Sequence, residues 1–209
     1  MIKKFGIAIA LATTLLGTGC SNMGAITQMA TGGGSGASAG DLVKETQIAL
    51  SGFVGAQINL AKAMNVYDAS AATQKQVENL KNGDPTSSET ANSIKTTAVL
   101  SAELQAKIEE GIKKGAVLDA GQKALAGQAT LQYVQGLASS TKVAGKVSQI
   151  VKNPTSVSPA YLPQLTAIAS NVPGVVQSAA GSTSSLFSYL TKNGVDVSKA
   201  KQAADSMDK

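Results

Sequence analysis

Apolar and small side chains recur every three or four positions over residues 41–66, a spacing that favours a helix over the strict alternation of a half-buried strand. The residues that carry this spacing are Leu42, Ala49, Phe53, Ala56, Leu60 and Ala63. A second helical pattern covers residues 69–81 and ends at Asn82-Gly83, a typical helix stop. No stretch shows the alternating β-branched and aromatic residues that a strand requires. The sequence therefore predicts an all-α fold, an antiparallel bundle of four to six helices in one domain over residues 41–209.

The strongest local helix signals lie in residues 86–115. Thr86 and Glu89 have the spacing of a capping box, so we expect a helix to begin there. Gly115 is expected to end or bend it. Glutamate-to-lysine pairs at a spacing of four support the helix by roughly 0.2–0.5 kcal/mol each. These pairs are Glu103 with Lys107, Glu109 with Lys113, and Glu110 with Lys114.

A fourth helical region, which is rich in glycine, is expected over residues 117–152. Interior glycine costs about 1 kcal/mol relative to alanine, so repeated glycine indicates close approach between helices. The glycines are Gly121, Gly127, Gly136 and Gly145. Asn153-Pro154 is expected to end this region.

No charged residue occurs among the 39 residues between Lys152 and Lys192, which hold four of the five prolines. Because proline interrupts helices, we expect two short helices here, over residues 160–171 and 173–191. Their uncharged surfaces are expected to face the core or a partner, with a membrane-active segment as the alternative. A last short helix, capped by Asp196 or Ser198, is expected to end near Met207.

The chain opens with Met1-Ile2-Lys3-Lys4, an apolar run from residue 5 to residue 16, and the small residues Gly17-Thr18-Gly19 before Cys20. This order of basic, apolar and small residues is typical of a secretory signal peptide. A membrane-spanning helix needs about 20 apolar residues, so the shorter run is expected to direct export and then be removed. Cys20 is the only cysteine, and a free thiol without a pairing partner is unusual in an oxidising compartment.

A signal that ends in small residues before a cysteine resembles the lipobox of bacterial lipoproteins, although Gly17 stands where leucine is usual and Leu16 lies one position earlier. The resemblance implies removal of residues 1–19, attachment of a diacylglycerol to Cys20 and anchoring in a membrane of the cell envelope. Ser21 in place of aspartate implies sorting to the outer membrane of Gram-negative bacteria. Residues 20–40, rich in Gly, Ser and Ala in their second half, are expected to form a flexible tether.

The chain has no histidine, tryptophan or arginine, and all 18 basic residues are lysine. Proteins recognise nucleic acids largely through arginine side chains and stacked aromatic rings. Because this chain lacks arginine and has few aromatic residues, we do not expect it to recognise nucleic acid. The lack of histidine excludes imidazole-based catalytic triads and the usual zinc sites. Loss of Lys3 and Lys4 with the signal leaves 16 lysines against 13 acidic residues, a net charge of +3 that indicates a solvated surface.

Three patterns resemble catalytic or ligand sites only superficially. Ser139-Ser140-Thr141-Lys142 matches the Ser-x-x-Lys motif of penicillin-recognising enzymes, but their Lys-Thr-Gly strand is missing from the sequence. Glu103, Glu109 and Glu110 are expected to be surface charges rather than an acid–base pair. The four tyrosines, which are Tyr67, Tyr133, Tyr161 and Tyr189, are expected to pack rather than to bind a ligand. We therefore expect no catalytic residue, metal or cofactor.

These observations predict a lipid-anchored envelope protein, attached through Cys20, that acts as a non-enzymatic binding or scaffolding module for a protein partner. A membrane-remodelling or pore-forming helical protein is the alternative.

Overall fold

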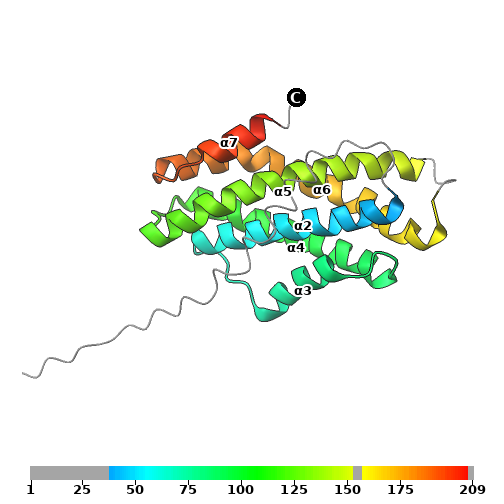
Figure 1. The fold of residues 1–209 in the computed structure, drawn as a ribbon. Helices are drawn as coiled ribbons and strands as arrows, with labels where there is room; N and C mark the ends of the chain where they lie inside the picture. Colours follow the sequence, from blue (N-terminus) through cyan, green and yellow to red (C-terminus); the bar gives the residue numbers. More distant parts are fainter. Residues whose placement is uncertain (1–37, 153–156, 207–209) are drawn as a thin grey trace, which may run out of the picture.

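The computed structural model describes residues 38–152 and 157–206, and within them every regular element is helical. The prediction of an all-α bundle is confirmed (Figure 1). The elements are α2 (Ala39–Ala63), α3 (Ala71–Asn82), α4 (Ser88–Lys114), α5 (Ala120–Lys152), the 3-10 helix η2 (Pro159–Tyr161), α6 (Leu162–Lys192) and α7 (Ser198–Asp205).

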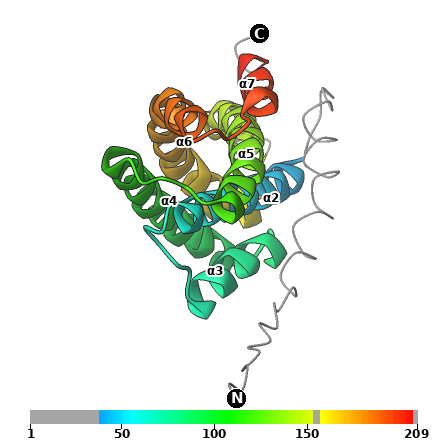
Figure 2. The same cartoon turned by 90° about the vertical axis from the view of Figure 1, so that its left-hand side faces the viewer.

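Consecutive helices from α2 to α6 alternate in direction, as hydrogen bonds between distant parts of the chain show. Gln47 and then Gln57 of α2 bond to Gly83, just before α4, and to Ser101 further along α4. Likewise, Gln164 and then Ser182 of α6 bond to Ser87 at the start of α4 and to Glu109 near its end. Because α3 and α5 each return the chain, α2, α4 and α6 run parallel to one another. α2 packs most extensively against α5, and α4 against α6. α3 and α7 lie on opposite sides of the bundle (Figure 2).

A capping box starts α2 two residues before the expected Asp41. The Ser38 hydroxyl accepts a hydrogen bond from the Asp41 amide, and the Asp41 carboxylate accepts one from the Ser38 amide at 3.0 Å. Both bonds satisfy amides that the first turn leaves without partners, which is why the helix extends into the last residues of the predicted tether.

α4 begins differently from the prediction. Its N-cap is Ser87, whose hydroxyl accepts from the Glu89 amide at 3.2 Å, so the capping-box role predicted for Thr86 is wrong. Thr86 instead donates through its amide and hydroxyl to the Asp84 carboxylate, both at 2.8 Å. The aspartate turn uses Thr86 and leaves the next residue to cap the helix. Gly115 ends α4 in the left-handed conformation (φ 63°), as predicted.

Of the three predicted ion pairs on α4, Glu110 with Lys114 forms, at 2.7 Å. The Lys107 Nζ lies 3.1 Å from the Glu110 Oε2 and does not form the predicted pair with Glu103. Glu110 can pair with both lysines because Lys114 contacts its other carboxylate oxygen. Glu109 accepts a hydrogen bond from the Ser182 hydroxyl of α6 at 2.6 Å. The carboxylate therefore takes part in helix–helix packing instead of the predicted pair with Lys113.

Close helix approach occurs at one of the glycines of α5. A Cβ placed on Gly136 would lie 2.8 Å from the Phe53 Cα, so α2 and α5 meet there nearly backbone to backbone. Nothing lies within 4 Å of a Cβ placed on Gly145, and that glycine has no packing role. α5 begins at Ala120, later than predicted, because Asp119 caps it: the Asp119 carboxylate accepts from the Gln122 amide, and the Gln122 side chain accepts from the Asp119 amide, both at 2.8 Å.

The expectation of two short helices after residue 159 is wrong, because α6 is one helix of 31 residues. Pro159 and Pro163 lie in the first turns of η2 and α6, where a missing amide costs little. Pro173 lies inside α6 but is flanked by Val172 and Val175, which are buried. Packing of both flanks against the bundle offsets the roughly 3 kcal/mol that an interior proline costs.

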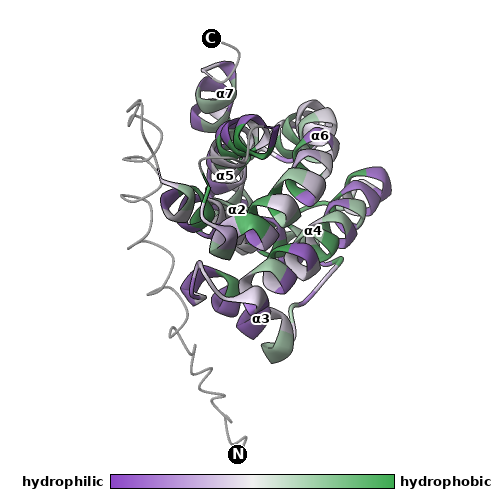
Figure 3. Cartoon of the chain, turned by 90° about the vertical axis from the view of Figure 1, so that its right-hand side faces the viewer, coloured by the Kyte–Doolittle hydropathy of each residue, from purple (hydrophilic) through white to green (hydrophobic). Residues whose placement is uncertain are grey.

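The core runs the length of the bundle and includes the apolar face of α6, whose residues before Lys192 are uncharged. Its largest fully buried side chains include Phe53, Ile94, Tyr133, Leu165 and Ile168. Hydrophilic residues cover much of α3 and α7, whereas α6 is mostly pale to green (Figure 3). The prediction that the uncharged segment packs in the core is thus confirmed for one face of α6.

α7 ends at Asp205, close to the expected end near Met207, which itself lies outside the described residues. Its N-cap is Val197, so neither Asp196 nor Ser198 occupies the capping position. The Asp196 carboxylate nevertheless accepts from the Ser198 amide at 2.9 Å, because the loop turns one residue before the helix begins.

Candidate functional site

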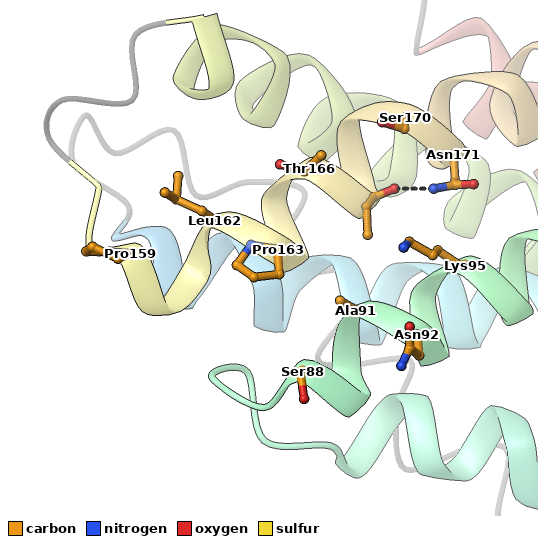
Figure 4. A pocket seen from close by; sticks show the side chains of 11 residues that line it. Ser88, Ala91, Asn92, Lys95, Pro159, Leu162, Pro163, Thr166, Ser170 and Asn171 are labelled. Atoms are coloured by element: carbon orange, nitrogen blue, oxygen red, sulfur yellow. Dashed lines mark hydrogen bonds between the residues drawn. The ribbon is translucent and has the colours of Figure 1, made fainter.

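A groove of about 590 Å³ opens between the first halves of α4 and α6 (Figure 4). We call it the α4–α6 groove. It is lined by Ser88, Ala91, Asn92, Lys95, Pro159, Leu162, Pro163, Thr166, Ala167, Ser170 and Asn171.

The groove is framed by contacts that hold the two helix starts together. The buried Gln164 side chain donates through Nε2 to the Ser87 carbonyl at 2.8 Å, which ties the first turn of α6 to the N-cap of α4. Pro159 and Pro163 fix the backbone where η2 leads into α6. The helix starts that border the groove are therefore held in place by the fold.

Lys95 is the only charged residue among those that line the groove. Asn92, Thr166 and Ser170 add amide and hydroxyl groups, while the Asn171 amide donates to the Ala167 carbonyl at 2.7 Å (Figure 4). No lining residue is an acid, a histidine or a cysteine. The groove thus offers hydrogen bonds and one positive charge, which suit binding, and no pair of groups for proton transfer.

Cys20, the predicted lipid-attachment residue, lies outside the described residues, as do the rest of the predicted signal peptide and nearly all of the tether. The prediction made for this residue therefore stays a prediction.

The Ser-x-x-Lys match at residues 139–142 lies within α5. Ser140 is buried, and the Thr141 hydroxyl donates back to the Leu137 carbonyl at 2.8 Å, as threonine commonly does inside a helix. The Ser140 and Thr141 side chains therefore serve the packing and the backbone of the helix.

The three glutamates of α4 have separate surroundings. Glu103 is exposed, and Glu109 bonds to Ser182. Hydrogen bonds from Lys114 and Lys107 hold the pKa of Glu110 below its usual range. Along the described parts of the chain, no group of three or more acidic, cysteine or histidine residues is placed to hold a metal ion.

The four tyrosines pack in or against the core, as predicted. The Tyr133 hydroxyl lies 3.0 Å from both the Gln105 Oε1 and the Ala179 carbonyl, and burial raises its pKa. The Tyr189 hydroxyl donates to the Ala116 carbonyl at 2.9 Å, and burial raises its pKa as well. These phenols hold neighbouring elements together.

Sequence reasoning did not identify the α4–α6 groove, because its two walls lie about 70 positions apart in the chain. The available signal was the proline-rich start of the uncharged segment, which supplies Pro159 and Pro163.

None of the helices in residues 38–152 and 157–206 is long and apolar enough to span a membrane. Comparison with protein-family models, curated proteins and solved structures finds no match for this chain.

Proposed function

We propose that this chain is an envelope lipoprotein, held at a membrane through Cys20, whose helical bundle binds or scaffolds a protein partner without catalysing a reaction. The resemblance of residues 1–20 to lipoprotein signals supports the anchor, and Ser21 supports the outer membrane as its destination. Two or three acyl chains on such a cysteine would give firm anchoring, because each buried methylene contributes about 0.8 kcal/mol.

The observation that carries the binding role is the α4–α6 groove. It combines apolar side chains, hydroxyl and amide groups, and the single cation of Lys95. A protein segment with small or apolar side chains and one carboxylate facing Lys95 is complementary to this lining. A carboxylate there would meet no acidic lining residue.

Photo-crosslinking in cells tests this proposal. A photoreactive amino acid replaces Thr166 in the groove, and in a control variant it replaces Ala72, which is exposed on α3. We expect a discrete protein adduct from position 166 and none of that size from position 72. Identical adducts from both positions, or lipid adducts alone from position 166, would contradict the proposal.

The alternative is a membrane-remodelling or pore-forming protein, and the uncharged segment before Lys192 is the feature that favours it. Insertion of α6 would remove Leu165, Ile168 and Leu186 from the core. It would also expose to lipid the backbone carbonyl that Pro173 leaves without its helical hydrogen bond, at several kcal/mol. We therefore expect the purified protein to release no dye from liposomes, and strong leakage would favour the alternative.

A further inference from the structure

The chain enters the bundle at the same end as the α4–α6 groove. The first turn of α2 is fixed by the capping box of Ser38, whose hydroxyl donates to the Asp41 carboxylate at 2.7 Å. A Cβ placed on Gly40 would lie 2.9 Å from the hydroxyl of Tyr161, the last residue of η2. Because η2 leads directly into α6, the start of α2 lies beside the start of α6 (Figure 1).

The groove is confined to this end of the bundle. Its lining residues on α6 extend from Leu162 to Asn171, so they lie within about 14 Å of the start of the helix. α6 has 31 residues and is therefore about 46 Å long. At the opposite end, Tyr189 near the end of α6 donates to the carbonyl of Ala116 in the loop after α4. That loop lies roughly 30 Å beyond the groove along the axis of α6.

The proposed lipid anchor joins the chain close to the groove. Seventeen residues separate Cys20 from Ser38, and the second half of this segment is rich in Gly and Ser. A linker of that length and composition spans roughly 25 Å on average. To bring the opposite end of the bundle to the bilayer, the linker would have to cover the length of α6, which is about twice its average span. Anchoring through Cys20 therefore favours an orientation in which the groove end faces the membrane.

We infer that the α4–α6 groove faces the membrane that carries the anchor and receives a segment of a membrane-embedded protein, just above the bilayer. The inference rests on the proposed anchor and binding role, and it names the kind of partner. Anchoring keeps the groove in a layer roughly 25 Å deep, where a segment held by the same membrane stays at high effective concentration.

The lining of the groove favours a protein segment over the lipid headgroups themselves. Surfaces that bind anionic lipids carry clusters of about 4–8 basic residues. The groove has one, Lys95, among apolar, hydroxyl and amide groups. A segment with small or apolar side chains and one carboxylate matches this lining better than a layer of phosphates does.

Energy transfer to a lipid-bound acceptor tests the orientation. The lipidated full chain is reconstituted in vesicles of phosphatidylethanolamine and phosphatidylglycerol that contain an acceptor-labelled lipid. Diacylglycerol occupies the Cys20 sulfur in this form, so a donor fluorophore reacts only with an introduced thiol. Thr166→Cys places the donor in the groove, and the matched control Val117→Cys places it at an 88% exposed position at the opposite end. We expect at least twofold higher transfer from position 166.

Equal transfer from the two positions, or higher transfer from position 117, would overturn the inference. A chain that does not float with the vesicles would contradict the proposed anchor, and the inference would fall with it. Flotation, measured first, distinguishes these two failures.

Photo-crosslinking in cells tests the membrane-held partner. The photoreactive residue stays at position 166, and the anchored chain is compared with Cys20→Ser, exported by a signal peptide that leaves no lipid. Loss of the anchor leaves the groove unchanged but removes the shared membrane, so we expect the protein adduct to fall at least tenfold at equal protein level. An undiminished adduct would overturn the inference and leave the proposed binding role standing. The absence of a protein adduct from the anchored chain would contradict both.

Discussion

Two glycines of α5 offer a direct test of the packing between α2 and α5. A Cβ added at Gly136 would lie 2.8 Å from the Phe53 Cα, 2.9 Å from its Cβ and 3.0 Å from its amide nitrogen. These atoms belong to or adjoin the backbone, so α2 itself must move. A Cβ added at Gly145 meets nothing within 4 Å. Gly136→Ala and Gly145→Ala are therefore the same change in the same helix, with and without a clash.

Both variants gain about 1 kcal/mol from the higher helix propensity of alanine. Overpacking at Gly136 costs about 1–3 kcal/mol, so the two unfolding free energies should differ by about 2 kcal/mol. For a domain of this size that difference corresponds to about 4–8 °C in melting temperature. We expect Gly145→Ala to melt above the unmodified protein and Gly136→Ala below it, in thermal unfolding followed by circular dichroism. Equal melting temperatures for the two variants would refute the close approach.

Three further predictions concern the core, a helix start and the anchor. Ile168→Lys places an unpaired charge at a fully buried position, and should lower the unfolding free energy by about 3 kcal/mol or more in denaturant titrations. Hydrogen bonds from the Thr86 amide and hydroxyl lower the pKa of Asp84 below its ordinary 3.8. The ionised Asp84 therefore stabilises the fold above pH 3.8, and this stabilisation is lost as the pH falls through the pKa of Asp84 in the folded protein. Asp84→Asn should accordingly reduce the difference in melting temperature between pH 7 and pH 3. Cys20→Ala should abolish incorporation of labelled fatty acid. Equal labelling of the variant and the unmodified protein would contradict the proposed lipid anchor.

Local patterns were sufficient to predict the all-α fold and the helices before residue 152, because helical periodicity and stop signals depend on neighbours in the chain. Gly115 ends α4 as its sequence context predicts. The capping role of Thr86 was not predictable in the same way, because Asp84 competes for its amide and hydroxyl. Two local motifs overlap there, and the shorter aspartate turn forms.

The continuous α6 and the α4–α6 groove depend on contacts between distant segments. Pro173 alone predicts an interruption, and only the burial of Val172 and Val175 against other helices explains why the helix continues. The groove likewise requires the parallel placement of α4 and α6, which follows from the return of the chain through α5. Neither arrangement leaves a periodic signal in the sequence.

Charge reversal at Lys95 tests the proposed binding role most directly. The photoreactive residue is kept at position 166, and the protein adduct is quantified in cells with Lys95, with Lys95→Glu and with the control Lys75→Glu, which changes an exposed lysine of α3. If a carboxylate of the partner faces Lys95, Lys95→Glu should reduce the adduct at least tenfold while Lys75→Glu leaves it unchanged. An adduct of undiminished yield from Lys95→Glu, at equal protein level and melting temperature, would contradict the proposal that this groove receives the partner.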